Sequence, residues 1–174
     1  MKTFRPNNPL FVLLILSLCI SCNSEKKDKN NSENNMEMTA ETEPLKIEIV
    51  ENYFTKNDMT PRVIQYFTID NQEDFDNQFG VAKTMDNAIS TIDFDKTRIG
   101  AIVMPATDIK TSIEITQAER FGSGAFITYK TKQGDKQSFT TTPTLIFKLP
   151  VDNKLKTLEF KSGGDSKMIT IPSK

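Results

Sequence analysis

The sequence predicts a mainly β fold of the α+β type, an antiparallel sandwich or partly open barrel with one short helix near residues 71–79. Three observations predict it. From residue 45 onward apolar side chains alternate with polar ones, which is typical of strands with one buried face. Turns that contain Gly or Pro separate these runs, and only the segment between residues 70 and 80 has helical spacing. Residues 45–174, about 130 in number, are enough for a single domain.

The alternating runs are the predicted strands. In each of them, every second side chain is apolar and its neighbours are polar or small, as expected where one face of a strand packs on a core and the other meets water. The apolar positions are Ile47 and Ile49; Ile64 and Tyr66; Ile113 and Ile115; Ala125, Ile127 and Tyr129; Leu145, Phe147 and Leu149; Leu158 and Phe160; and Ile169 and Ile171.

Two Gly-containing segments predict hairpin turns. The first is Gln133-Gly134-Asp135, which precedes the run Ser138–Thr141, and the second is Ser162-Gly163-Gly164-Asp165. The segment Arg98–Met104 is different, because it is apolar almost without a break. It predicts a central strand that is buried on both faces.

The segment from residue 70 to residue 80 predicts the helix. Asp70 is its expected N-cap with Glu73 reaching back, and acidic residues crowd the first turn. Phe75 and Phe79 lie four residues apart and so share one face, while Gly80 suits a left-handed end. The acidic side chains could also form a calcium site, but the cap and a solvated face account for all of them.

The first 21 residues predict an export signal. Lys2 and Arg5 precede an apolar or small stretch from Leu10 to Ile20, and small Ser21 lies before Cys22. This stretch of eleven residues is short for a bilayer-spanning helix, which needs roughly 20 apolar residues.

Cys22 is the predicted site of acylation, because the segment resembles the signal of a bacterial lipoprotein, in which the cysteine after the cut becomes the lipidated N-terminus. Two or more acyl chains give stable membrane anchoring. We therefore expect a lipid-anchored protein of the cell envelope, in the outer membrane. The alternatives are modification of Cys19 and an ordinary secretory signal whose cysteines are incidental.

Residues 22–44 predict a disordered, acylated tether. The segment has six acidic residues and three lysines, and its only large apolar side chains are Met36 and Met38. It lacks the apolar area that would offset the entropy of ordering. Met36 and Met38 could bind a soft metal, although two thioethers without further ligands are usually incidental.

The composition excludes several classes of function. The chain has no histidine and no tryptophan, and its two cysteines both lie within the first 22 residues. Zinc and copper sites depend on cysteine and histidine ligands, and triad or thiol catalysis needs a histidine base or a cysteine nucleophile. No cofactor motif is present. Because residues 45–174 are close to neutral, no basic surface for nucleic acid is expected.

Two carboxylate pairs support an alternative function, an envelope hydrolase directed at glycans. The pairs are Asp93 with Asp95 and Glu114 with Glu119, which could act as acid and base. Asp93 and Asp95 also have the spacing of calcium ligands, but the remaining ligands and the glycine of an EF-hand loop are absent.

Short motifs between residues 62 and 150 give the chain a family resemblance. They are Glu73-Asp74-Phe75 and Phe79-Gly80, then Ile92-Asp93-Phe94 before Ile99–Val103, then Ile113-Glu114-Ile115, and Thr142-Pro143 before Leu145-Ile146-Phe147. In this order they resemble the C-terminal domain of PrcB, a lipoprotein subunit of an outer-membrane protease complex. The family usually has a Gly-rich turn after the central strand, where this chain has Pro105–Lys110. The resemblance implies an accessory or binding role and no catalytic residue.

The leading hypothesis from the sequence is therefore a non-enzymatic, lipid-tethered β domain that binds an envelope protein and assists a protease or surface complex. Two segments are the expected binding surface, the loop Met104–Lys110 and the segment Gln117–Gly124. In the second, Gly122 and Gly124 permit backbone angles that other residues rarely adopt. A purely structural spacer is the remaining alternative.

Overall fold

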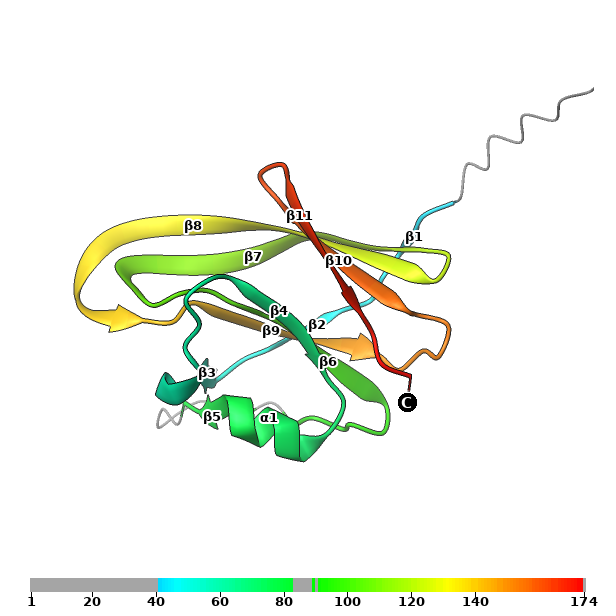
Figure 1. The fold of residues 1–174 in the computed structure, drawn as a ribbon, viewed down its shortest axis with the longest axis horizontal. Helices are drawn as coiled ribbons and strands as arrows, with labels where there is room; N and C mark the ends of the chain where they lie inside the picture. The colour runs from blue at the N-terminus through cyan, green and yellow to red at the C-terminus, as the bar shows by residue number, and fades with distance from the viewer. Residues whose placement is uncertain (1–40, 83–88, 90, 174) are drawn as a thin grey trace, which may run out of the picture. The chain divides into compact units, whose positions relative to one another are not determined.

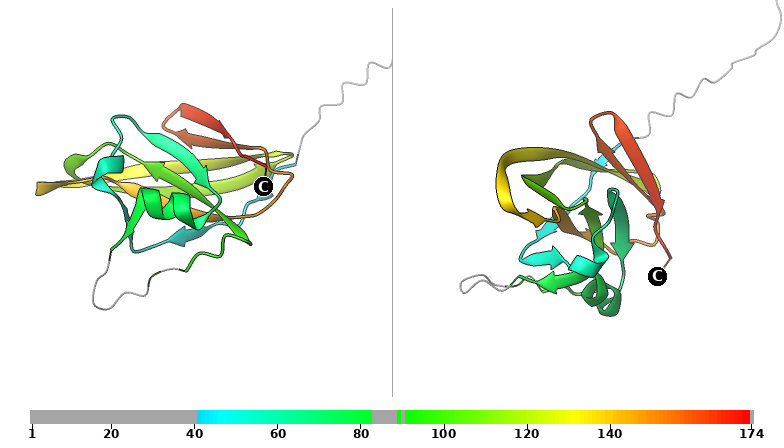
Figure 2. Two further views of the ribbon diagram at one scale, coloured as in Figure 1. Left: turned by 60° about the horizontal axis from the view of Figure 1, so that its bottom comes forward. Right: turned by 60° about the vertical axis from the view of Figure 1, so that its left-hand side comes forward.

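The computed structural model describes residues 41–82, 89 and 91–173, and these form a mainly β fold with one short helix, as predicted. The first sheet has the strand order β1-β7-β8-β10-β11, the second has the order β2-β9-β6-β4, and β3 pairs with β5 (Figure 1). None of these sheets closes into a barrel (Figure 2).

The strands of the first sheet are β1 (Glu43–Pro44), β7 (Thr107–Phe121), β8 (Gly124–Thr141), β10 (Thr157–Ser162) and β11 (Asp165–Thr170). The others are β2 (Glu48–Val50), β9 (Thr144–Pro150), β6 (Thr97–Val103), β4 (Gln65–Ile69), β3 (Tyr53–Thr55) and β5 (Phe79–Val81). Because β1 includes the last two residues of the predicted tether, the fold begins before the predicted boundary at residue 45.

The four-stranded sheet is the middle of three layers. One of its faces packs on the five-stranded sheet through a core that includes Phe147 and Phe160. Its other face is covered by α1 (Gln72–Gln78) and the β3–β5 pair, around Phe75 and Phe79. The β sandwich therefore has a second, smaller core on the far side of the four-stranded, inner sheet.

Strand β6 is buried along nearly its whole length, which confirms the prediction for Arg98–Met104. Ile99, Ala101 and Val103 face the core under α1, whereas Ile102 faces the core between the sheets. The neighbouring strand β9 behaves in the same way, since Ile146 points to one core while Phe147 points to the other.

The helix forms where the sequence predicts it, but two details of its ends are different. Asn71, not Asp70, is the N-cap, and its side-chain oxygen accepts a hydrogen bond of 2.8 Å from the Asp74 backbone N–H. Gly80 does not end the helix in a left-handed conformation, because the chain continues into β5 with Phe79 as the C-cap. The shared face of Phe75 and Phe79 is confirmed, with ring centroids 5.1 Å apart.

Asp70 has a different function, which is to neutralise a buried arginine. The Arg98 side chain is only 5% exposed and donates two hydrogen bonds to the Asp70 carboxylate. Arg98 also donates a hydrogen bond of 2.8 Å to the carbonyl oxygen of Pro172. The Arg98 side chain thus joins β6 to the residue after β4 and to the segment after β11.

The predicted turn at Gln133-Gly134-Asp135 is wrong, because these residues lie inside β8, a strand of 18 residues. The reversal occurs earlier, at Gly122-Ser123, where Gly122 has a φ of 56°. Along the pair β7–β8 the register shifts between Thr107 and Thr111, and extra residues on β8 accompany its bend (Figure 1).

The predicted hairpin at Ser162–Asp165 is confirmed. Strands β10 and β11 pair antiparallel, and the two residues between them, Gly163 and Gly164, have φ angles of 58° and 96°. Positive φ at both central residues is what a two-residue hairpin turn of type I′ requires. Strand β10 also pairs with β8, in parallel, and this places the hairpin at the edge of the five-stranded sheet.

Candidate functional site

Several predicted site residues lie outside the described part of the chain. These are Cys22 with its alternative Cys19, and the two thioethers of Met36 and Met38. Acylation at Cys22 therefore stays a prediction. Within the residues that the structure describes, no helix is long and apolar enough to cross a bilayer.

The carboxylates of Asp93 and Asp95 form part of a turn before β6. The Asp93 carboxylate accepts hydrogen bonds from Lys96 Nζ at 2.8 Å and from the Asp95 backbone N–H at 3.1 Å. The hydrogen bond from Lys96 is the main reason that the pKa of Asp93 lies below its ordinary value. Asp93 is thus held in its charged form by its own turn.

Glu114 and Glu119 lie on the same strand, β7, and are not brought together. Five residues of extended strand span roughly 16 Å, whereas an acid and base pair for glycoside hydrolysis needs a separation of about 5–9.5 Å. Glu114 instead pairs with Lys132 at 2.7 Å and Lys130 at 3.5 Å across the β7–β8 ladder. These two lysines lower the pKa of Glu114, Lys132 most of all.

The acidic residues around α1 are used by the helix and its neighbours. Asp74 accepts a hydrogen bond of 2.8 Å from the Asn71 side-chain amide, and Asp76 accepts one of 2.7 Å from Gln72. In the described part of the chain, no three carboxylate, histidine or cysteine side chains gather where a metal ion could be held.

The two predicted binding segments lie at opposite ends of β7. The loop before β7 contributes Met104 and Ala106 to separate hollows, and the segment Gln117–Gly124 forms the end of β7, the turn and the start of β8. The hollow at Ala106 is lined mainly by Phe54 and by threonines. The hollow beside the turn is larger, with a volume of about 550 Å³.

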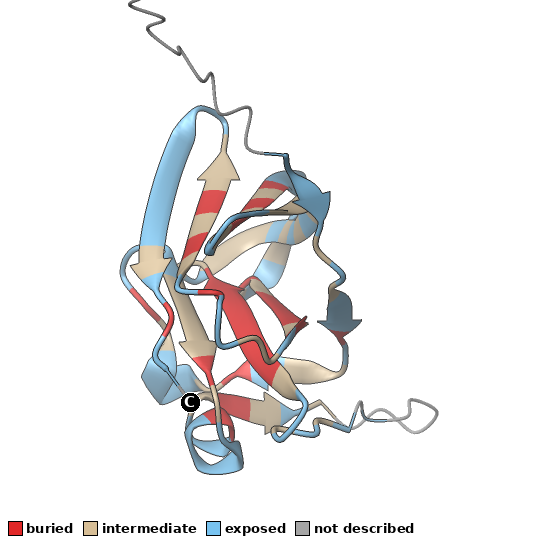
Figure 3. Ribbon diagram, turned by 90° about the vertical axis from the view of Figure 1, so that its right-hand side faces the viewer, coloured by how far each residue is buried: buried red, intermediate tan, exposed pale blue. Residues whose placement is uncertain are grey.

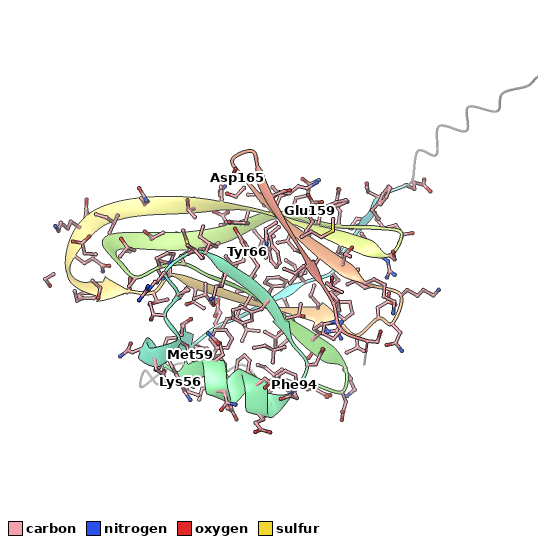
Figure 4. All side chains as sticks on the ribbon, viewed as in Figure 1. Lys56, Met59, Tyr66, Phe94, Glu159 and Asp165 are labelled. Atoms are coloured by element: carbon pink, nitrogen blue, oxygen red, sulfur yellow. The ribbon has the colours of Figure 1, made fainter. Side chains whose placement is uncertain are left out.

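We call this larger hollow the outer groove, because it lies on the face of the five-stranded sheet that points away from the sandwich core. The strand register assembles it: Phe126 on β8 lies beside Glu159 on β10, which in turn lies opposite Met168 on β11. The labelled Glu159 marks its place (Figure 4). The outer groove is lined by Phe121–Phe126, Thr157, Glu159 and Met168.

Gly124 makes the groove hollow. In the next row of the sheet Phe121 lies opposite Gly124, which lies beside Thr157. A Cβ on Gly124 would be 3.0 Å from the Thr157 hydroxyl oxygen, so that a larger residue would crowd Thr157 beside the groove.

Exposed apolar side chains surround this hollow. Phe121 is 41% exposed and Met168 is 59% exposed, and the rings of Phe121 and Phe126 lie 6.2 Å apart. Strand β11, which carries Met168, is exposed along most of its length (Figure 3). The outer face of this sheet thus presents two aromatic rings and a thioether to solvent.

Charged groups lie along the rim of the outer groove. The ammonium group of Lys161 lies 4.0 Å from the centre of the Phe126 ring and 3.5 Å from the Glu159 carboxylate. At the turn, Arg120 donates hydrogen bonds to the Gly122 carbonyl and to the Asp152 carboxylate, which ties the turn to the loop after β9. The groove is therefore held in shape by contacts on both sides.

A smaller hollow lies between the two sheets at their open side. There the hydroxyl of Tyr66 on β4, which is labelled in Figure 4, lies 2.6 Å from the hydroxyl of Tyr129 on β8. Burial, followed by this hydrogen bond, raises the pKa of Tyr66 above its ordinary value. The hollow has a volume of about 190 Å³, smaller than most small-molecule sites.

The sequence predicts one side of the outer groove but not the other. The predicted binding segment Gln117–Gly124 contributes to the groove, whereas Phe126 and Met168 lie outside both predicted segments. A local signal for Phe126 existed, since it interrupts the polar face of a strand whose opposite face is Ala125, Ile127 and Tyr129. Nothing local could place Met168 beside it, because that contact depends on the pairing of β8 with β10 and of β10 with β11.

Comparisons with known proteins found no relative of this chain. No family model matches the chain, and neither a curated protein nor a solved structure matches it. The structure by itself defines a mainly β fold whose four-stranded sheet has the five-stranded sheet on one face and α1 with the β3–β5 pair on the other.

Proposed function

We propose that this chain is a lipid-anchored binding protein of the bacterial cell envelope, without catalytic activity of its own, and that it holds a partner protein in the outer groove. The single observation that carries this proposal is the exposed apolar groove on a sheet face that packs against nothing in the described part of the chain. Phe121, Phe126 and Met168 are of the residue types enriched at protein interfaces.

The rim of the groove has the composition expected around such a site. Lys161 and Glu159 flank the apolar centre and can form hydrogen bonds with a partner, while the apolar side chains exclude water between them. The predicted acyl chain on Cys22 would keep the domain close to envelope proteins. The resemblance to the PrcB domain adds support for an accessory role in a protease or surface complex.

The hydrolase alternative has no comparable support. Asp93 and Glu114, one member of each predicted pair, are engaged by lysines, and Glu114 lies far along the strand from Glu119. Neither pair lines the outer groove.

The proposal is tested by recovering the full-length, acylated chain from envelope membranes in mild detergent. We expect a stoichiometric partner with the parent chain, and we expect its loss when Phe126→Ser and Met168→Ser are combined. The matched control is Phe139→Ser, since Phe139 is 57% exposed on the same strand but lies outside the groove. Recovery of the parent chain alone would overturn the proposal, as would equal partner recovery with the double variant.

A further inference from the structure

We propose a second binding site, for a neutral sugar unit of a glycan, in the hollow between β3 and the end of β8. We call it the threonine hollow, and the residues that line it include Phe54, Thr55, Asn57, Thr60 and Thr140–Thr142. Its volume is about 290 Å³, close to the lower end of the range for small-molecule sites. The site goes beyond the proposed function, because no residue lines both this hollow and the outer groove.

Segments that are distant in the sequence build the threonine hollow. Phe54 and Thr55 are the last residues of β3, and a single-turn helix, Asn57–Met59, follows them. The end of β8 and Thr142 complete the wall. These segments meet at the left-hand end of the molecule in Figure 1, and the label of Met59 marks the single-turn helix in Figure 4.

Phe54 supplies an exposed aromatic surface that is held in place by β5. Phe54 is 47% exposed, and it lies opposite Gly80 in the β3–β5 pair. A Cβ on Gly80 would lie 2.6 Å from Phe54 Cζ and 3.0 and 3.1 Å from its Cε atoms, as a point above the plane of the ring does. One ring face therefore rests on the backbone of β5. Because aromatic faces carry partial negative charge, such a ring suits the weakly positive C–H groups on the face of a sugar.

The threonine hydroxyls offer both donors and acceptors. Thr144 Oγ1 donates a hydrogen bond of 3.0 Å to the Thr142 carbonyl, which uses its single proton. Thr55, which is only 3% exposed, must therefore donate in the 2.7 Å contact between its hydroxyl and that of Thr144, and its oxygen can still accept. The hydroxyls of Thr60 and Thr142 lie 3.1 Å apart, and this contact uses only one of their two protons. A sugar hydroxyl can donate to the one kind of group and accept from the other.

The absence of charge around the hollow decides the class of ligand. None of the described residues that line it is charged, although 26% of all residues in the chain are. Lys56 lies next to Asn57 in the sequence, but its ammonium group donates to the carbonyl oxygen of Asp76 on α1. An anion would find no cation here, and an apolar ligand would leave hydroxyls unpaired. Since none of these lining residues is a carboxylate, the site would bind a sugar without hydrolysing it.

The experiment uses the full-length, acylated chain in a detergent without a sugar headgroup. Saturation-transfer NMR is recorded with glucose, galactose, mannose and N-acetylglucosamine, and with sialic acid as the anionic comparison. We expect transfer to at least one of the four neutral sugars and none to sialic acid. Transfer to none of the neutral sugars, or to sialic acid alone, would overturn the proposal.

Variants test whether the threonine hollow is the place of binding. Phe54→Ala, and Thr60→Val combined with Thr142→Val, should each reduce the transfer severalfold. Asn57→Ala should also weaken it, and this change is at an exposed side chain away from both cores. Transfer that is unchanged in all three variants would overturn the proposal.

Matched controls come from β8 and from the outer groove. Phe139→Ala and Thr131→Val change exposed residues of β8 that do not line the threonine hollow, and we expect parental transfer from both. Phe126→Ser combined with Met168→Ser should also leave sugar binding unchanged. Partner recovery decides the proposed function separately, so either idea can fail while the other stands.

Discussion

Gly100 shows how one residue without a side chain allows two strands of the inner sheet to pack. It lies opposite Phe147 in the β6–β9 pair, and the ring of Phe147 covers it. A Cβ at this position would be 2.4 Å from Phe147 Cζ, and Phe147 is fully buried between the two sheets. The ring therefore has no free space into which it could move.

We expect Gly100→Ala to lower the free energy of unfolding by about 1–3 kcal/mol, because it overpacks a dense core. Urea unfolding followed by circular dichroism measures this change. Gly134→Ala is the control, since its nearest neighbour, Lys110 Cβ, would be at an ordinary 3.6 Å on the exposed part of β8, and we expect a change within about 0.5 kcal/mol. Equal losses in the two variants would contradict this account of Gly100.

Asp70 illustrates why residue roles predicted from local sequence can change. Its position before the helix suits an N-cap, and so does that of Asn71. Arg98 decides between them, because a buried guanidinium needs a carboxylate and Asp70 is within reach. Asn71, which has no charge to offer, then caps the helix.

At the scale of elements, β8 also shows that contacts with distant parts of the chain can override a local sequence preference, here over a longer segment. Gln133-Gly134-Asp135 has turn chemistry, yet β7 pairs with this part of β8, where Thr111 lies opposite Gln133. Backbone hydrogen bonds along the ladder outweigh a local turn preference, and the register shifts allow the strand to bend instead of reversing.

The contact between the β7–β8 turn and the loop after β9 predicts that the stability of the fold depends on pH. The hydrogen bond from Arg120 is the main reason that the pKa of Asp152 lies below its ordinary value, and the Lys154 backbone N–H adds to it. A carboxyl whose pKa is lower in the folded chain stabilises the fold above its unfolded pKa, which is about 3.9. This stabilisation is lost as the pH falls through the folded pKa.

We therefore expect Asp152→Asn to unfold at a lower urea concentration than the parent at pH 7, with a difference of up to about 1 kcal/mol because the pair is partly exposed. The difference should shrink as the pH falls below about 4. Urea midpoints of both chains at a series of pH values measure it. A gap that stays constant down to pH 2 would show that the charge of Asp152 does not contribute.

At the scale of the whole molecule, the predicted lipid and the outer groove would act together. The first strand enters the fold beside the groove, so an anchor at Cys22 would be joined to the groove by some twenty residues. The sequence predicts a disordered tether, and a flexible coil of that length has a mean span of roughly 25 Å.

We expect Cys22→Ala to move the protein out of the outer-membrane fraction or to change its electrophoretic mobility, because the acyl chains and the signal cleavage that accompanies them are lost. Fractionation of cells followed by immunoblotting measures both. Cys19→Ala should behave like the parent chain. Unchanged fractionation together with unchanged mobility of Cys22→Ala would refute the predicted anchor.

The sequence by itself determined the class of the fold, the buried central strand, the helix and the Gly163-Gly164 hairpin, because each depends on side-chain spacing or backbone freedom within a few residues. It also predicts the acylation site. Only the tertiary structure decided that the inner sheet is covered on both faces, that Asp70 pairs with Arg98, and that Phe126 and Met168 share a groove. These features join residues that are 28 or more positions apart, and the order of strands in a sheet follows from the packing of the whole chain.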